Sequence, residues 1–451
     1  MIPQDKTFTR ITLFCLLLTA PVAAFTEESP IHANGGSVAP EAPNEALYLD
    51  VPGVIERIKA ENLQLLVSRE SVRRALEQSY QRRAALLPQF AVRAEQARQQ
   101  IARGVNGAAI NASPFDRFSG RIEASLSLFD TQRYADYRIA RLGLAIAEDD
   151  LQLAVQDFLE QAIFVYFSQL RDLRNLEIVQ GNLEREKELF NLAKLRFDAG
   201  AAVKIDVTRA QVRVAAQRRA LMQAETDLQG SALQLKSLLN IDLDRPIVLD
   251  RSFVEDIPPP PSPQPELINQ RPDILSQEKQ LRRADLARKA AGWQRLPSLD
   301  LFADWGYDSR RALDGEEGEA WLVGLRANMP LWEGGRIAAE KREASAAVRQ
   351  NEYQLSDLRN RVEEEYTFAL IEMDSRFAQI EIASDEVRLG RDEVAQARER
   401  YEEGLADNRE LIDAQNRLSD AELSRLNAVY QYGLSRLAFA RAVASVETVL
   451  D

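Results

Sequence analysis

The distribution of proline constrains the fold of this chain more strongly than any other feature of its sequence. No proline occurs between Pro114 and Pro246, and none follows Pro330. Because proline lacks a backbone N–H and its ring clashes inside a helix, both of these proline-free spans can be helical throughout. A proline-rich stretch between them, residues 258–265, predicts an extended polyproline connector that joins two halves of the chain.

Sequence landmarks in the two halves recur at a nearly constant separation. The segment Ala193–Gly200 is similar to Ala397–Gly404, which lies 204 positions later (404 − 200). The motif Leu-Phe-Asp at residues 128–130 matches Leu-Trp-Glu at residues 331–333. Each half therefore predicts the same order of elements: a helix, a Leu-Pro break, strands, a very long helix, a glycine turn and a returning helix.

The predicted helices have the spacing of coiled coils. In the first returning helix, Val207, Ala210 and Val214 begin a strict alternation of three- and four-residue steps. The helix from about residue 132 to 199 would be on the order of 100 Å long. Two shorter helices in the same half together match that length. We therefore expect two short helices stacked end to end beside one long helix, twice per chain.

Alternation of apolar and polar residues predicts strands. Trp321, Val323, Leu325 and Met329 are expected to face lipid in a membrane-spanning strand, and they alternate with Leu322, Gly324, Arg326 and Asn328. Similar alternation occurs near residues 122–128 and 299–307, whereas charges interrupt a fourth stretch that follows Phe90. The polar, glycine-bearing stretches from 104 to 114 and from 310 to 319 are expected to be loops. A pair of soluble hairpins packed on a core is the alternative to membrane strands.

Four strands are too few to close a barrel in a membrane. The smallest membrane barrels have about eight strands, and an open sheet edge in lipid leaves backbone groups unpaired. If these strands span a membrane, the chain must therefore oligomerise. A dimer with eight strands and a trimer with twelve both remain possible on this argument.

The first residues predict export from the cytoplasm. Lys6 and Arg10 precede an apolar run and a small-residue cleavage site at Ala24, as in a secretory signal peptide. The only cysteine, Cys15, lies inside this run and follows Phe14 instead of a small residue. We therefore expect neither a lipid anchor nor a disulfide.

Charge and composition argue against nucleic-acid binding and catalysis. The formal net charge of −13 disfavours nucleic acid as a partner. The single histidine, His32, lies in a polar segment, and no P-loop, nucleophile elbow, zinc-type spacing or dinucleotide fingerprint is present in the sequence. We expect no catalytic residues, no cofactor and no metal site, and the chain is not predicted to be an enzyme.

These features divide the chain into five segments. Residues 1–24 are the predicted signal peptide, 25–52 an N-terminal extended segment, 53–257 the first structural repeat, 258–271 the proline-rich connector, and 272–451 the second repeat. The predicted fold class is mainly α, with a long α-helical coiled-coil barrel. A transmembrane β-barrel, to which each chain contributes four strands, completes the predicted fold.

The ordered and duplicated landmarks resemble the TolC-like outer-membrane efflux family over nearly the whole mature chain. The residues that carry the resemblance are Arg271-Pro272-Asp273, Leu296-Pro297-Ser298-Leu299, Pro330-Leu331-Trp332-Glu333-Gly334-Gly335 and the two glycine turns. The resemblance implies a homotrimer, with a twelve-stranded barrel in the outer-membrane lipid and a twelve-helix tunnel in the periplasm. It also implies a passive exit duct that docks to a periplasmic adaptor and to an inner-membrane efflux pump or ABC transporter. A soluble periplasmic coiled-coil protein, such as the adaptor itself, is the alternative.

The resemblance also assigns roles at the glycine turns. The turn residues Gly200, Ala201, Gly404 and Leu405 are expected to form helical tips that dock the adaptor. We expect both glycines to adopt the left-handed conformation that ends a helix.

Four further residues near the tips match functional positions of the family. Glu410 and Asp413 are neighbours on one helix face and match acidic positions that line the periplasmic entrance, so a pore or selectivity ring is expected. Asp206 and Tyr401 match positions whose hydrogen bond holds the tips closed. Ala406 stands where an arginine often joins that network. We expect a weaker clamp, or one in which Arg400 or Arg409 takes the place of that arginine.

Overall fold

The computed structural model describes residues 46–100, 102–105, 108–111, 114–252, 257–309, 318–405 and 408–447. The predicted signal peptide, His32 and Ala406 lie outside the described residues. The elements, in chain order, are β1 (Leu47–Leu49), α2 (Val51–Glu61), α3 (Leu63–Ala84), β2 (Gln89–Gln99), β3 (Ala102–Val105), β4 (Ala108–Asn111), β5 (Phe115–Phe129), α4 (Thr131–Asp198), α5 (Lys204–Leu238), β6 (Ile247–Leu249), the 3-10 helix η1 (Pro265–Gln270), α7 (Pro272–Trp293), β7 (Ser298–Ser309), β8 (Gly318–Asn328), α8 (Arg336–Glu402) and α9 (Asn408–Ala442).

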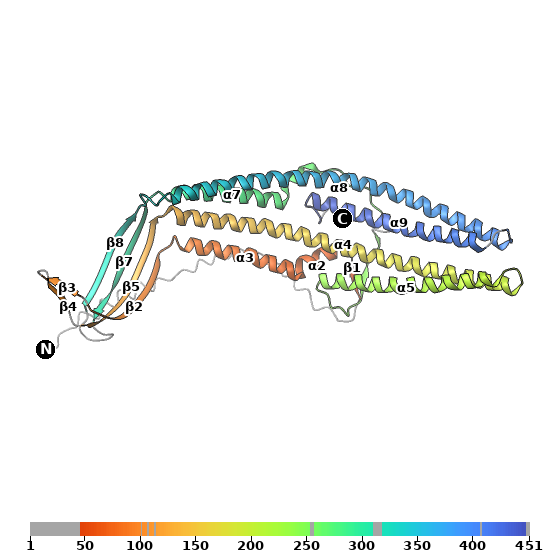
Figure 1. Cartoon of the computed structure of the whole chain (residues 1–451), viewed down its shortest axis with the longest axis horizontal. Coiled ribbons are helices and arrows are strands. Elements are labelled where there is room, and N and C mark those ends of the chain that lie inside the picture. The colour runs from red at the N-terminus through yellow and green to blue at the C-terminus, as the bar shows by residue number, and fades with distance from the viewer. Residues whose placement is uncertain are drawn as a thin grey trace. The chain divides into compact units, whose positions relative to one another are not determined.

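Two helices are very long, as the proline-free spans predict. The helix α4 contains 68 residues and α8 contains 67. Asp130 caps α4, because its carboxylate accepts hydrogen bonds from the backbone N–H groups of Gln132 and Arg133 at 2.9 and 3.1 Å. The helices α3 and α5 pack along α4, and α7 and α9 pack along α8 (Figure 1). The arrangement of two short helices beside each long one is therefore present in both halves.

The returning helices end in the same way at matching positions. Both α5 and α9 contain 35 residues, and their first residues lie 204 positions apart (408 − 204). Each is followed by a non-glycine residue in the left-handed region, Asn240 with φ 53° and Ala444 with φ 52°. Left-handed residues other than glycine are uncommon and usually reflect a tight turn. The two halves thus share local backbone geometry even where the side chains differ.

Four strands form an antiparallel sheet in the order β2-β5-β7-β8. Their register gathers apolar residues on one face. The residues of this apolar face are Phe90, Val92, Ala94, Ile122, Ala124, Leu126, Leu299, Leu301, Ala303, Trp305, Trp321, Val323, Leu325 and Ala327. The opposite face carries ion pairs, among them Arg93 with Glu123 at 2.9 Å and Arg121 with Asp304 at 2.5 Å. The stretch after Phe90, which was weakly supported by alternation, is therefore a full strand, and its arginines Arg93 and Arg98 have acidic partners on the next strand.

The ends of the strands differ from the alternation in the sequence. Because β8 ends at Asn328, Met329 lies beyond the strand on which it was expected. Pro330, which follows Met329, has no N–H to donate to a strand ladder. In β5 the register shifts after Ser127, so that Phe129 and not Leu128 pairs with Leu299.

Two further features depart from the predictions. The stretch from 104 to 114, expected as a loop, contains β4, which pairs with β3. The proline-rich connector is not extended throughout, since Pro265–Gln270 form a 3-10 helix. The segment 25–52, predicted to be extended, contains the strand β1, which pairs in parallel with β6, 200 positions later (247 − 47). Among the described residues, no helix is both long and apolar enough to cross a bilayer.

The largest apolar core lies where α4 passes α2, the end of α5 and the end of α9. Ile58, Leu159, Ile163, Tyr166 and Leu235 are among its fully buried side chains. The Tyr166 hydroxyl donates to the backbone carbonyl of Asp250 at 3.0 Å, and burial raises the pKa of this phenol well above its usual range. The β1–β6 pair is thereby attached to the middle of α4.

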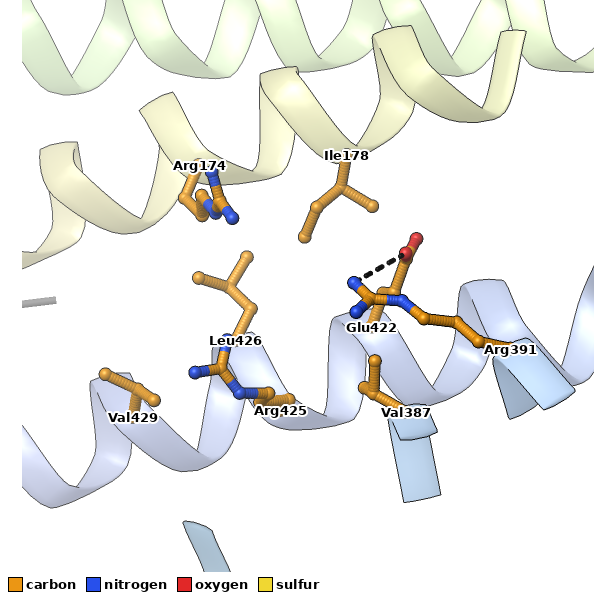
Figure 2. A pocket seen from close by; sticks show the side chains of 8 residues that line it. All are labelled: Arg174, Ile178, Val387, Arg391, Glu422, Arg425, Leu426 and Val429. Carbon is orange, nitrogen blue, oxygen red and sulfur yellow. Dashed lines mark ion pairs between the residues drawn. The ribbon is translucent and has the colours of Figure 1, made fainter. Parts of the chain in front are cut away.

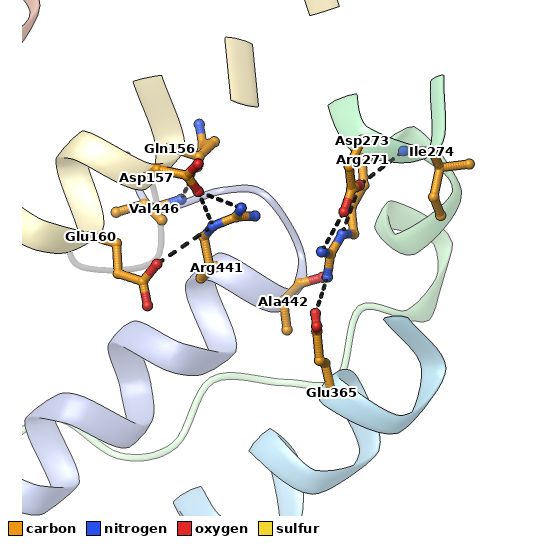
Figure 3. A network of polar contacts seen from close by, with 10 residues as sticks. All are labelled: Gln156, Asp157, Glu160, Arg271, Asp273, Ile274, Glu365, Arg441, Ala442 and Val446. Atoms are coloured by element: carbon orange, nitrogen blue, oxygen red, sulfur yellow. Dashed lines mark hydrogen bonds and ion pairs between the residues drawn. The ribbon is translucent and has the colours of Figure 1, made fainter. Parts of the chain in front are cut away.

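A buried arginine joins three helices at this level of the chain. Arg271 precedes α7 and is 3% exposed. Its guanidinium donates two hydrogen bonds to the Asp273 carboxylate, at 3.1 and 2.7 Å. Its remaining nitrogen donates to Glu365 of α8 at 2.8 Å and to the carbonyl of Ala442 at the end of α9 at 3.2 Å (Figure 3). A second arginine, Arg441, belongs to α9 and lies 2.5 Å from Asp157 of α4. The Arg-Pro-Asp motif therefore fixes the start of α7 against the second helical hairpin.

Candidate channel entrance at the helical tips

The turns after α4 and α8 have the same backbone structure. Gly200 and Gly404 have φ values of 76° and 78°. In the first turn, the N–H of Ala201 donates to the carbonyl of Arg196 at 2.8 Å, and Leu405 donates to Arg400 at the same distance in the second. This six-to-one hydrogen bond with a left-handed glycine is the Schellman motif, and it confirms the predicted helix-ending role of both glycines.

Both turns expose residues to solvent. Ala201 and Leu405, two of the predicted docking residues, are exposed, and Leu405 is exposed to 66%. Val203 and Ile205 beside the first turn are also more than half exposed. Apolar side chains at the ends of two adjacent hairpins form a surface suited to a protein partner.

Tyr401 connects the two helical hairpins just above the turns. Its side chain is 4% exposed and packs in a small cluster with Leu189 of α4 and Leu411 of α9. The guanidinium of Arg196 lies over the Tyr401 ring, 4.4 Å from its centroid, and also donates to the Tyr401 carbonyl. Because Arg196 belongs to the last turn of α4, this contact joins the first hairpin to the second.

Asp206 raises the pKa of Tyr401 although the two side chains make no direct hydrogen bond. Within the described part of the chain, the buried Tyr401 hydroxyl has no hydrogen-bond partner. Burial raises the pKa of Tyr401, the Arg196 charge opposes this, and the Asp206 carboxylate raises the pKa further. Asp206 itself lies 3.6 Å from Arg209 on its own helix. The structure thus places the two predicted clamp residues near one another, with Arg196 as the residue that bridges the hairpins.

The family often has an arginine in the clamp at the position of Ala406, and Arg400 does not take its place. Arg400 instead pairs with Glu410, with 2.9 Å between Nε and Oε1. The contact of Arg196 with Tyr401 was not predicted from the sequence. Its position in the last turn of α4, aligned with Arg400 in the second half, was the only signal available.

The two predicted pore acids differ in their surroundings. Glu410 and Asp413 are both exposed on α9, whereas Leu411 and Ala414 of the same helix are buried. Glu410 is paired with Arg400, while Asp413 makes no ion pair with any described residue. The nearby Arg417 is held by Glu393 at 2.9 Å. Asp413 therefore carries the less compensated of the two charges.

Polar contacts continue between the hairpins above the tips. Asn182 of α4 donates to Ser419 of α9 at 2.8 Å, and Arg185 lies 2.7 Å from Glu422. Figure 2 shows Glu422 beside a cavity between α4, α8 and α9, where Arg391 approaches it to 4.0 Å. Two arginines from different hairpins therefore share one carboxylate. The hairpins are joined here by charges and hydrogen bonds instead of a thick apolar core.

No site for a metal is found near these residues. Groups of three or more His, Cys, Asp or Glu side chains arranged to hold an ion do not occur in the described ranges.

The arrangement of a four-stranded sheet and two long helical hairpins can be compared with known proteins. A family model described as outer membrane efflux protein matches residues 54–240 and 265–445. The chain belongs to the outer membrane efflux protein family. As a member of this family it is an outer-membrane channel protein and not an enzyme, and its helices form the periplasmic part. The resemblance to TolC-like proteins is thereby confirmed.

Relatives of this efflux protein have related roles and the same fold. The pyoverdine export outer membrane protein OpmQ of Pseudomonas aeruginosa is 26% identical over 373 residues, which covers 80% of this chain and 76% of OpmQ. The alkaline protease secretion protein AprF of the same species is 23% identical over 351 residues, covering 72% and 69% of the two chains. The crystal structure of the Campylobacter jejuni CmeC outer membrane channel superimposes with a TM-score of 0.76 at 18% identity, covering 88% of this chain and 86% of CmeC.

Proposed function

We propose that three copies of this efflux protein form a passive exit duct through the outer membrane. The observation that carries the proposal is the four-stranded sheet, which has one continuous apolar face, one ion-paired face and two open edges. An eight-stranded barrel is filled by its own side chains, whereas larger barrels enclose water. A duct therefore requires more than two copies, and three give twelve strands with the apolar face toward lipid and the charged face toward water.

The helices extend the duct into the periplasm. Helices of 68 and 67 residues span about 100 Å at 1.5 Å per residue. Two such hairpins per chain supply twelve helical columns in a trimer. The exposed turns at their ends would dock a periplasmic adaptor, and an inner-membrane efflux pump or ABC transporter would deliver the substrate and supply the energy. The relatives OpmQ and AprF are named for pyoverdine export and for alkaline protease secretion, so both small molecules and polypeptides are candidate substrates.

Membrane fractionation with a measurement of oligomer mass tests this proposal. We expect the mature protein in the outer-membrane fraction of a Gram-negative host. In detergent its mass should equal three chains, and heating should convert the trimer to monomer on gels. A soluble periplasmic monomer would contradict the duct.

Removing the Arg196 side chain is expected to loosen the closed tips. A cation–π contact in a partly buried setting contributes about 1–2 kcal/mol, so Arg196→Ala should raise the open population roughly tenfold and increase mean conductance in planar bilayers. Tyr401→Phe should raise conductance by less, since the phenyl ring still accepts the cation. Asp206→Ala should also raise it by less, since Asp206 makes no direct hydrogen bond to Tyr401. Arg388→Ala is the control, because Arg388 forms an exposed pair with Asp385 of its own helix α8. Equal conductance of the Arg196 and Arg388 variants would contradict this role.

The cation selectivity of the proposed acidic ring is expected to depend mainly on Asp413. Three copies place six carboxylates from Glu410 and Asp413 near one narrow opening, where a negative field attracts cations. Asp413→Asn should lower the cation-to-anion permeability ratio about twofold or more at low salt, where screening is weak. Glu410→Gln should have a smaller effect, because Arg400 already offsets Glu410. Reversal potentials in a KCl gradient measure this, with Asp385→Asn as the control on α8. No change in the double variant Glu410→Ala with Asp413→Ala, while the trimer is intact, would rule out the ring as the filter.

Docking at the tips is tested by crosslinking in cells. A photoreactive residue at Ala201 or Leu405 should capture a co-produced periplasmic adaptor, because both positions are exposed at the turns. The same residue at Met222, which is 69% exposed in the middle of α5, serves as the control. Adducts at Met222 without adducts at either turn would place the adaptor elsewhere.

A further inference from the structure

The two outer strands of the sheet have matching lengths and directions. Both β2 and β8 contain 11 residues, and each has one side without a partner strand among the described residues. All three pairings in the sheet are antiparallel, so β8 runs opposite to β2. A strand edge in lipid must be paired. The β8 edge of one copy can therefore pair with the β2 edge of the next in an antiparallel ladder.

We propose one register for this seam, in which Val92 of one copy lies opposite Leu325 of its neighbour. The inference rests on the proposed trimeric duct and specifies how its copies join. In this register Gln89 lies opposite Asn328 and Gln99 lies opposite Gly318, so both strands are paired along their whole length.

The slope of the sheet selects this register. Following one row across the sheet, Gln89 pairs with Ser125, Ser125 with Phe302, and Phe302 with Gly324. Gly324 lies four residues before the end of β8 at Asn328 (328 − 324). When Asn328 of one copy pairs with Gln89 of the next copy, a row of paired residues that crosses all four strands reaches the next β2 four residues away from its Gln89. The row is therefore displaced by four residues over four strands. With about 3.4 Å per residue and about 4.8 Å between strands, this stagger corresponds to a tilt of about 35°.

Neighbouring registers give less suitable tilts. Membrane barrels have strands tilted by about 35–45°. A shift of two residues gives about 47° in one direction and about 20° in the other, and either shift leaves two residues of each strand unpaired. The register with aligned ends is therefore the one that lies within the range and pairs both strands along their whole length.

Side-chain chemistry favours the same register. A shift of one residue places Val92 opposite Arg326 and brings the apolar face of one copy against the charged face of the next. The steeper two-residue shift places Arg93 directly opposite Arg326, and like charges at that spacing repel. The proposed register instead places Arg98 opposite Glu319, which are oppositely charged.

Cysteine crosslinking tests the register directly. Cys15 is the only native cysteine and lies in the predicted signal peptide, so introduced thiols have no competitors in the mature chain. Glu95→Cys with Leu322→Cys places two thiols opposite one another on the charged face in the proposed register. The comparison pairs are Leu322→Cys with Arg93→Cys and with Ala97→Cys, which lie opposite in the two shifted registers. Directly opposite residues meet disulfide geometry, whereas diagonal neighbours at about 7–8 Å do not.

Oxidation of intact membranes is expected to convert the Glu95→Cys, Leu322→Cys variant to a covalent trimer, at least tenfold more than either comparison pair. Preferential crosslinking of a comparison pair would overturn the register and leave the trimer standing. A trimer on native gels with no crosslink in any pair would show that β2 and β8 do not pair. Absence of any wild-type oligomer would instead count against the proposed duct.

A charge exchange gives an independent test that needs no cysteine. Arg98→Glu should lower the trimer yield, by up to about fivefold, because it places two acids opposite one another at the seam and also replaces the partner of Asp116 on β5, 3.9 Å away, by an acid. Adding Glu319→Arg should restore the yield. Failure of the second substitution to restore the yield lost in the first would contradict the register.

Discussion

Arg271→Ala is expected to lower the free energy of unfolding by about 3 kcal/mol. The Arg271 guanidinium is buried and satisfies Asp273, Glu365 and the last carbonyl of α9 at once. Removing it leaves the 16% exposed Asp273 carboxylate and a helix-end carbonyl without their donor. Because Glu365 is 57% exposed and can be solvated, the expected loss in the free energy of unfolding lies at the lower end of the range for a broken buried ion pair.

Arg388→Ala is the matched control for this variant, because it removes the same side chain and the same charge. Arg388 lies 3.0 Å from Asp385, and both side chains are more than 60% exposed. Such a pair contributes less than about 1 kcal/mol. Urea unfolding followed by helical circular dichroism, at one fixed protein concentration, measures both variants. Equal midpoints for the two would show that Arg271 does not hold the start of α7 in place.

Leu325→Arg is expected to destabilise the membrane-inserted protein by about 2–4 kcal/mol. Leu325 pairs with Leu301 and is 63% exposed on the apolar face of the sheet. An arginine there would have to enter lipid, where no group in the sheet can pair with it. The yield of folded oligomer in the outer membrane should fall accordingly.

Leu322→Arg tests whether the effect belongs to the face of the strand or to the substitution itself. Leu322 lies in the same strand, is also half exposed, and pairs with Asp304 on the charged face. An arginine at this position would face water and an acid, so we expect little loss of oligomer. Similar losses for both variants would show that the faces are wrongly assigned.

The features that were predicted correctly from the sequence have local physical causes. Gly200 and Gly404 ended their helices as expected, because glycine adopts a left-handed conformation at no steric cost. The lengths of α4 and α8 followed from the absence of proline. The alternation from Trp321 to Leu325 identified β8, since side chains in a strand point to opposite faces in turn.

The features that were missed depend on partners distant in the sequence. The charges of β2 obscured its alternation, yet Arg93 is paired with Glu123 of β5. The parallel pair of β1 and β6 joins residues about 200 positions apart. Arg196 meets the Tyr401 ring only because two hairpins lie side by side, and no local pattern contains that information.

Single-channel recording in planar bilayers tests the central claim most directly, namely that three copies of this chain enclose a conducting path. The purified trimer should insert to give discrete, uniform current steps that favour cations, which is the selectivity that we propose for Asp413 and its copies. Bilayers that contain the trimer, as detected by antibody, and yet remain electrically silent would contradict the account.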